Sequence, residues 1–306
     1  MTELEIIRHA RVGGISIFFD SVEYRTAHFH PEWELIWVTG GVLSVRCGQR
    51  EETCREGELC LFPPNRIHEF RRAGHEAVIL CLQISPQLFS LSFPALGALS
   101  VDDFLLSAQL GETQMQTLRA EMRALMAEYL TASPCYELRC IERCARILAQ
   151  LLSALPLRRM SEDELAHAGK RNERLNRFLR YVEQNYMRRL TLEEFALSEG
   201  CSVSYMSRFL KSNLNQSFQE YVNLVRYHAA CRLIAAGGKR MIDICEEAGF
   251  SDYRYFSQCF KRQSGLTPEE YSRSAPRENA FPAQRSLHSL ERFYSKEESE
   301  QLLQAL

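Results

Sequence analysis

Apolar residues in the last third of the chain recur at helical spacing, in two blocks that have turn and capping residues at corresponding positions. The first block predicts a short helix over residues 192–199, ended by Gly200, and then a second helix capped by Ser202. The second block has Gly249 and Asp252 at the corresponding places. Such a repeat indicates one structural unit used twice. Two short helices joined by a glycine turn are typical of a helix-turn-helix, so the pattern predicts two of these units.

Capping signals predict the flanking helices. Thr191 with Glu194, and Ser217 with Glu220, have the spacing of a capping box, in which each side chain satisfies the other's free N–H. The second box predicts a longer helix that bridges the two units and ends at Gly237. Another amphipathic helix precedes the first unit. Its apolar positions are Leu175, Phe178, Leu179, Val182 and Tyr186.

The stretch from Gly249 to Tyr271 resembles the signature of the AraC/XylS family of bacterial transcription regulators, although Ser272 intervenes before Arg273. The resemblance extends over about residues 170–273 and implies a double helix-turn-helix that binds DNA. In each unit the second helix packs its apolar face inward, which leaves the opposite face for DNA. We expect DNA contacts there from Ser204, Ser207, Arg208, Lys211, Tyr253, Arg254, Ser257, Gln258 and Lys261.

Within that set, the resemblance places base-reading positions at Ser204, Arg208, Tyr253, Arg254 and Gln258. Arginine suits a bidentate grip on guanine and glutamine on adenine, so Arg254 and then Arg208 are the leading candidates. The alternative for each is a phosphate contact or a solvated side chain. Charge agrees with DNA as the partner: residues 170–273 carry 17 Lys and Arg against 12 Asp and Glu, whereas the whole chain has a net charge of -2.

Short apolar runs over residues 15–84 alternate with turn residues and predict strands of a sandwich or barrel. The clearest runs are residues 34–38, 42–46, 58–62 and 77–82.

His28, His30 and Glu34, followed by His68, resemble the metal ligands of the two cupin-barrel motifs, although Asn65 replaces a glycine of the second motif. Three imidazoles and one carboxylate suit a first-row divalent metal. The even numbering of the first three predicts that they face the same side. We favour the interpretation that all four line an effector pocket, without a resident cofactor. A metal site and a purely structural role stay open.

Two apolar stripes, over residues 112–130 and 138–155, predict helices that pack on the barrel or on a partner's matching helices. The family resemblance favours dimerisation here. The polar residues 156–169 are predicted to be an interdomain linker. Residues 289–305 are predicted to form one acidic amphipathic helix, for which the sequence suggests no role.

A chain of 306 residues is long enough for two or three domains. The prediction is a multidomain β and α protein. Its parts are a cupin-like sensing barrel (1–100), a helical dimerisation region and linker (101–169), an all-α double helix-turn-helix (170–275) and a tail (276–306). The start of the chain lacks an export pattern, and its longest apolar run is too short for a membrane span. We therefore expect a cytoplasmic protein whose 11 cysteines are reduced.

The predicted function is a transcription regulator, more an activator than a repressor, that is not an enzyme. We expect it to bind double-stranded DNA as a homodimer, to contact RNA polymerase and to respond to a small molecule in the barrel. One alternative is a cupin metalloenzyme attached to a DNA-binding module. Another is a ligand-free regulator whose barrel serves only dimerisation.

Overall fold

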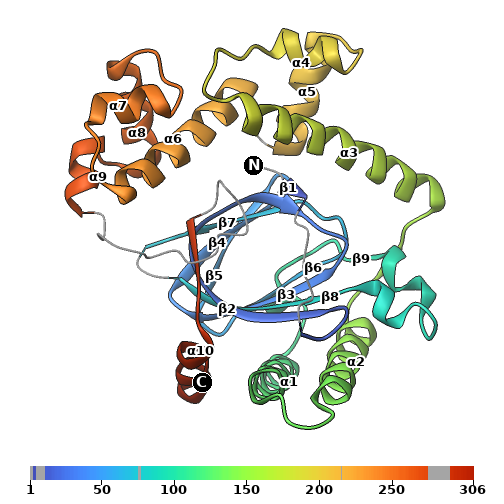
Figure 1. The fold of residues 1–306 in the computed structure, drawn as a ribbon. Coiled ribbons are helices and arrows are strands. Elements are labelled where there is room, and N and C mark those ends of the chain that lie inside the picture. Colours follow the sequence, from blue (N-terminus) through green and yellow to red (C-terminus); the bar gives the residue numbers. More distant parts are fainter. Residues whose placement is uncertain (1–2, 5–10, 75–76, 215, 275–289) are drawn as a thin grey trace.

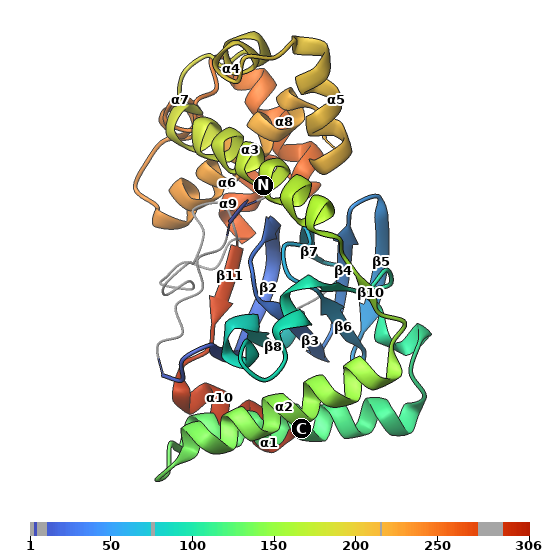
Figure 2. The same cartoon turned by 90° about the vertical axis from the view of Figure 1, so that its right-hand side faces the viewer.

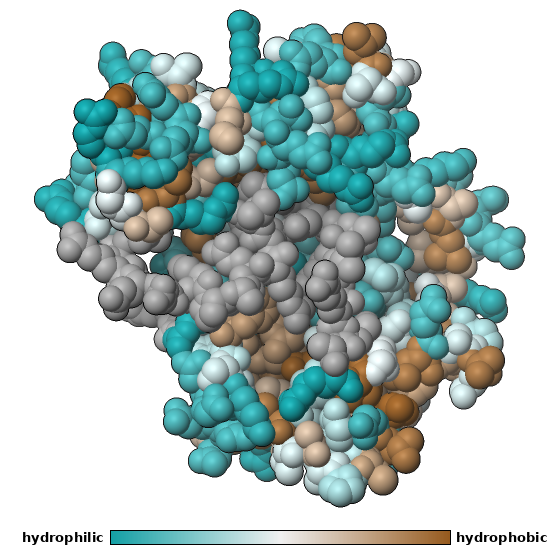
Figure 3. Space-filling model, in the orientation of Figure 1, coloured by the Kyte–Doolittle hydropathy of each residue, from teal (hydrophilic) through white to brown (hydrophobic). Residues whose placement is uncertain are grey.

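The computed structural model describes residues 3–4, 11–74, 77–214, 216–274 and 290–306. A strand-rich body lies in the middle, with one group of helices above it and a smaller group below (Figure 1). Figure 3 shows that hydrophilic side chains dominate the surface of the upper group in this view. Among the described residues, no helix combines the length and apolar character that crossing a membrane requires.

The strands form an antiparallel, nearly closed barrel, as predicted (Figure 1). Neighbouring strands follow the order β5-β4-β7-β2-β8-β3-β6. The long strand β2 pairs with β8 through residues 15–21 and with β7 through residues 24–28, so it joins two parts of the wall. The bounds are β2 Ile15–Phe29, β3 Trp33–Gly40, β4 Val42–Cys47, β5 Arg50–Arg55, β6 Leu59–Phe62, β7 His68–Arg72 and β8 Val78–Ile84. A short β1 (Glu3–Leu4) pairs with β2 in parallel.

Alternation along β3 separates the inside of the barrel from its outside. The outward-facing side chains pack in the apolar cluster between the barrel wall and the lower helices; they are Trp33, Leu35 and Trp37. The inward-facing Ile36 and Val38 belong to the cluster inside the barrel. The indole Nε1 of Trp33 donates a hydrogen bond to the carbonyl of Leu96, 3.1 Å away. This alternation puts Glu34 on the inner face, as its parity predicts.

The two predicted stripes form helices α1 (Glu112–Thr131) and α2 (Tyr136–Ala154), which lie side by side below the barrel (Figure 2). Their apolar residues are buried against the outer face of the barrel and against each other. Packing within the chain therefore accounts for most of both stripes. Leu138, at the start of α2, is 67% exposed.

The upper helices contain both predicted helix-turn-helix units. In the first, the Ser202 hydroxyl accepts a hydrogen bond from Tyr205 N at 3.2 Å, and in the second, Asp252 Oδ1 accepts one from Tyr255 N at 2.7 Å. The bridging helix begins with the predicted box of Ser217 and is ended by Gly237. The bounds are α3 Glu162–Asn185, α4 Leu192–Ser198, α5 Val203–Leu214, α6 Phe218–Ala236, α7 Met241–Glu247, α8 Tyr253–Ser264 and α9 Pro268–Ser274.

One predicted cap forms only in part. The Thr191 hydroxyl accepts a hydrogen bond from Glu194 N at 3.3 Å. The Glu194 carboxylate does not return the bond, because it accepts hydrogen bonds from the Tyr181 hydroxyl at 2.8 Å and Arg188 Nη1 at 2.9 Å instead. Hydrogen bonds from Tyr181 and Arg188 therefore take the place of the predicted bond from the Thr191 backbone N–H.

Most of the predicted linker, residues 156–169, is helical, and its role as a linker stays a prediction. Helix α3 starts at Glu162, because Ser161 and Glu164 form a full capping box. The polar composition of this segment reflects an exposed helical turn rather than an irregular chain. The segment before α3 contains a short strand, β10 (Arg158–Arg159), which pairs with β9 (Leu99–Ser100).

The tail also differs from its prediction. Its described part, which begins at Leu290, is a strand followed by a helix, not one helix: β11 (Leu290–Phe293) pairs with β2, and α10 (Lys296–Ala305) packs near α1. Ser295 and Glu298 form the capping box that starts α10. The predicted position 289 lies outside the described residues.

Candidate functional site

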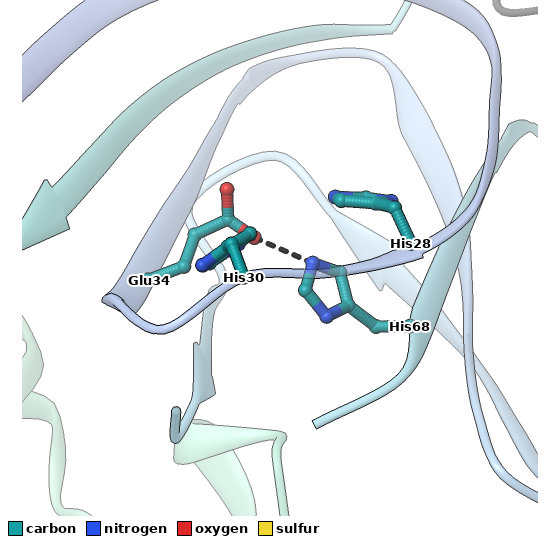
Figure 4. Close-up of side chains that lie close together, drawn as sticks. All are labelled: His28, His30, Glu34 and His68. Atoms are coloured by element: carbon teal, nitrogen blue, oxygen red, sulfur yellow. Dashed lines mark ion pairs between the residues drawn. The ribbon is translucent and has the colours of Figure 1, made fainter. Parts of the chain in front are cut away.

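Four polar side chains meet inside the barrel at the end nearest the upper helices. His28 comes from β2, His30 from the turn after it, Glu34 from β3 and His68 from the start of β7. Each is at most 2% exposed. One possible ligand atom from each lies within 4.8 Å of the others (Figure 4). The predicted shared direction is thus confirmed, whereas the role of the cluster stays a prediction.

The carboxylate of Glu34 is the centre of this cluster. Its Oε2 lies 2.7 Å from His68 Nε2 and 3.6 Å from His30 Nε2. Its other oxygen, Oε1, accepts hydrogen bonds from Gln83 Nε2 at 2.9 Å and from the Cys81 thiol at 3.1 Å. The two oxygens therefore have separate partners, and Oε2 is held toward the histidines.

Backbone carbonyls orient two of the imidazoles. His28 Nδ1 lies 2.8 Å from the carbonyl oxygen of Thr26, and His68 Nδ1 lies 2.8 Å from that of Arg66. A carbonyl oxygen can only accept, so each Nδ1 carries the proton. His28 Nε2 is then left with a lone pair, whereas His68 Nε2 faces the acceptor Glu34 Oε2 at 2.7 Å. Metal-binding histidines are characteristically oriented by such a bond from the second ring nitrogen.

Burial determines the charge of the site. Burial, and then the neighbouring His68 and Arg25, holds the pKa of His28 well below its usual range, so this ring is neutral. Burial alone would raise the pKa of the Glu34 carboxyl, but His30 and His68 outweigh it and hold that pKa well below the usual range. The neutral His28 ring and the Glu34 carboxylate anion are the ligand forms that a divalent cation requires.

The free space beside the cluster is small. A cavity of about 20 Å³ is bounded by side chains of β2, β3, β7 and β8 and by two residues of β11. A single water needs roughly 10–15 Å³ of such space. The cavity is therefore large enough for about one ion or one water. Its lining includes Arg25, His28, Glu34, Glu291 and Phe293.

Asn65 departs from the cupin pattern without disturbing the site. Its backbone is left-handed, with φ of 62°, a conformation that asparagine tolerates better than most residues. Its N–H donates to the carbonyl of His30 at 2.8 Å. The loop that leads to His68 is thereby tied to the segment that carries His30.

Sequence reasoning missed several residues around the cluster. Glu32, 6% exposed, lies 3.5 Å from His30 Nδ1, while Gln83 orients Glu34 from β8. A glutamine in an otherwise apolar strand was the available signal for Gln83. Arg25 and Glu291 lie too far apart in the sequence for any local pattern to pair them.

The second candidate surface is formed by the outer faces of α5 and α8. Ser204, Ser207, Arg208 and Lys211 are exposed on α5. On α8, Arg254, Gln258 and Lys261 are exposed, whereas Tyr253 and Ser257 are half-buried. The predicted DNA-facing residues thus share one face of each helix.

Tyr253 is the most constrained of this set, because its hydroxyl donates a hydrogen bond to the Glu269 carboxylate of α9. Burial and that carboxylate both raise the pKa of Tyr253. Reading a base with this hydroxyl would require breaking that bond. Arg254 is exposed beside it.

Comparison with known proteins identifies both regions. Residues 17–179 match the AraC-like ligand binding domain, and residues 195–274 match a helix-turn-helix domain. The transcriptional activator RhaS of Mannheimia succiniciproducens is 29% identical over 102 residues, which are 33% of this chain and 38% of that protein. RhaS of Klebsiella pneumoniae is 23% identical over 249 residues, 79% of this chain and 86% of its own. The structure of ToxT from Vibrio cholerae aligns with 84% of this chain and 97% of its own at 14% identity, with a TM-score of 0.42.

Proposed function

Because the chain belongs to the AraC family of transcription regulators, we propose that it is a DNA-binding activator controlled by an effector in the barrel. Helices α5 and α8 would enter two successive major grooves of one half-site. The observation that carries this proposal is the pair of helix-turn-helix units joined by one continuous helix, each with a polar face open to solvent. We also propose that the chain is a regulator and not an enzyme.

The length of α6 supports binding in successive grooves. Its 19 residues span about 28 Å at 1.5 Å per residue. Successive major-groove faces of B-DNA are about 34 Å apart. A spacer of this length holds two recognition helices at a separation of that order, so both units can act on one face of the duplex.

For base reading we propose Arg254 and Arg208, with the other exposed polar residues of α5 and α8 contacting phosphates or bases. Arg254→Ala should weaken binding to the cognate half-site by about 1–3 kcal/mol and relax the preference at one base pair. Fluorescence anisotropy with the cognate duplex and single-base variants measures both effects. Arg262→Ala is the matched control, because it removes the same charge from an exposed position of α8 that borders Glu220 and Asn223 of α6. An equal loss on every sequence would make Arg254 a phosphate contact.

For the barrel we propose a divalent first-row metal ion as the occupant, held by His28, His30, Glu34 and His68. The donor set, the Nδ1 hydrogen bonds of two histidines and the fixed Glu34 carboxylate support this choice. When bound, the ion would supply a fixed positive charge in the barrel. The expectation of a small-molecule effector in the barrel stands beside this proposal.

Metal content tests this assignment directly. We expect about one Co²⁺ or Zn²⁺ per chain after dialysis, with visible absorption of the Co²⁺ form that reports histidine ligation. His68→Ala and Glu34→Gln should abolish the signal. His167→Ala, an exposed histidine of α3, should retain it. Equal metal content in wild type and Glu34→Gln would refute the site.

We further propose a homodimer and a contact with RNA polymerase. Since α1 buries its stripe within the chain, the proposed dimer surface is the exposed side of α2 around Leu138. Light scattering should give twice the chain mass for wild type, and Leu138→Glu should reduce it to one chain. An unchanged mass would exclude this surface.

A further inference from the structure

We propose that residues 290–306, here called the C-terminal strap, link the barrel site to the second helix-turn-helix unit. The strap consists of β11 and α10 and follows the DNA-binding helices in the chain, yet it packs on the barrel (Figure 1). This inference rests on the proposed function, because it assigns the route by which occupation of the barrel acts on DNA binding.

Strand β11 occupies an edge of β2 that the other long strands leave available. Ser21 pairs with Val78 of β8 on one side and with Arg292 of β11 on the other. Tyr24 likewise has a partner in β7 and, through Leu290, one in β11. The strap is therefore an added strand of the barrel wall, and its position is fixed by backbone pairing.

A buried ion pair fixes the register of this strand. Arg25 Nη1 of β2 lies 3.1 Å from Glu291 Oε2 of β11, and the two side chains are 4% and 6% exposed. Removing either partner would break a buried charge pair, which is typically unfavourable. The pair thus specifies one docked position of the strap.

The inner side of the strap faces the proposed metal site. Glu291 and Phe293 line the same small cavity as His28 and Glu34. A dication held by the four ligands would lie beside that cavity, where it would attract the Glu291 carboxylate and repel Arg25, because the low dielectric of the interior strengthens both interactions. Occupation of the site therefore acts on the ion pair that holds the strap.

The outer side of the strap belongs to the second helix-turn-helix unit. Leu290, 5% exposed, is part of the apolar cluster that contains Leu224 and Tyr227 of α6. Tyr24 of β2 belongs to the same cluster, and its ring centroid lies 4.7 Å from that of His228. Leu290 therefore contacts the DNA-binding unit, while the adjacent Glu291 lines the cavity beside the barrel site.

The far end of the strap is anchored separately. Leu302 and Leu303 of α10 pack against the apolar cluster shared by the barrel, α1 and α2, on the side away from the DNA-binding helices (Figure 2). A substitution there weakens the anchor without touching the second unit, and so provides a control for substitutions in β11.

The experiment measures the dissociation constant of the full chain for one DNA half-site, with Zn²⁺ alone as the probe and with chelator. For wild type we expect a change of about 5-fold or more between the two conditions, the lower range of typical allosteric coupling. Leu290→Ser should reduce that change to less than about 2-fold, while the control Leu303→Ser should keep it. Glu291→Gln, which preserves the size of the side chain and removes its charge, should behave like Leu290→Ser.

Three other results would contradict either the strap proposal or the proposed function. A Leu290→Ser protein and a Glu291→Gln protein that respond to Zn²⁺ as wild type does would overturn the strap as the link. A wild-type affinity that is the same with and without Zn²⁺ would also overturn it, since the strap would have nothing to relay. A chain that binds no half-site under either condition would refute the proposed function instead.

Discussion

The turn glycines of the two helix-turn-helix units occupy equivalent places but face different surroundings. Gly200 has φ of 65° and Gly249 has φ of 86°, so both adopt a left-handed backbone that disfavours side chains. A Cβ added at Gly200 would meet no atom within 4 Å. A Cβ at Gly249 would lie 2.4 Å from the carbonyl oxygen of Tyr186 and 2.8 Å from Met187 Cα. Alanine at the two sites should therefore have unequal effects.

The expected magnitudes follow from these contacts. A left-handed conformation costs a residue with a side chain roughly 1–2 kcal/mol. At Gly249 the overpacking adds about 1–3 kcal/mol, because the clashing atoms belong to the backbone. The Tyr186 carbonyl cannot withdraw freely, since it accepts a hydrogen bond from Arg226 Nε of α6 at 2.8 Å. We expect Gly249→Ala to destabilise the DNA-binding helices by about 2–5 kcal/mol and Gly200→Ala by about 1–2 kcal/mol.

Two spectroscopic signals separate these helices from the barrel during urea unfolding. The chain has 2 tryptophans, Trp33 and Trp37, and both lie in β3, so tryptophan fluorescence follows the barrel. Circular dichroism at 222 nm follows the helices. Gly249→Ala should lower the midpoint of the dichroism transition much more than Gly200→Ala does, with little change in the fluorescence transition. Equal midpoints for the two variants would refute the packing argument.

Two further predictions concern the first unit and the bridging helix. Glu199 accepts hydrogen bonds from Arg177 at 2.6 and 2.8 Å and from Arg174 at 3.1 Å, and these guanidinium groups, Arg177 first, lower its pKa. Its stabilisation is therefore present above the unfolded carboxyl pKa of about 4.3 and is lost as pH falls through the lower folded value. Glu199→Gln should cost about 1 kcal/mol at pH 7, and the difference from wild type should vanish in strong acid; a constant difference across pH would contradict the assignment. Ser217→Ala should remove the cap of α6 and cost about 1 kcal/mol by thermal melting, and an unchanged melting temperature would count against this cap.

Local patterns predicted the helices and the barrel well, because caps and alternation act within a few residues. The turns at Gly200 and Gly249, the N-caps Ser202 and Asp252, and the inward direction of Glu34 were all readable in this way. The clustering of the four candidate ligands also followed from a motif with recognisable spacing.

The errors arose where distant parts of the chain decide the structure. The polar composition of residues 156–169 did not reveal that a capping box at Ser161 starts α3 within them. The segment from Leu290 became a strand because an edge of β2 was available for pairing, which no local propensity reports. Likewise, the Arg25–Glu291 pair joins residues from opposite ends of the chain.

The most direct test of the central claim is a hydroxyl-radical footprint of the purified chain on its half-site. Two recognition helices joined by α6 should protect two windows on one face of the duplex, about one helical turn of 10–10.5 base pairs apart. Substituting Arg208 should weaken one window, and substituting Arg254 the other. A single protected window, or protection that both substitutions weaken equally, would contradict a two-unit reader of DNA.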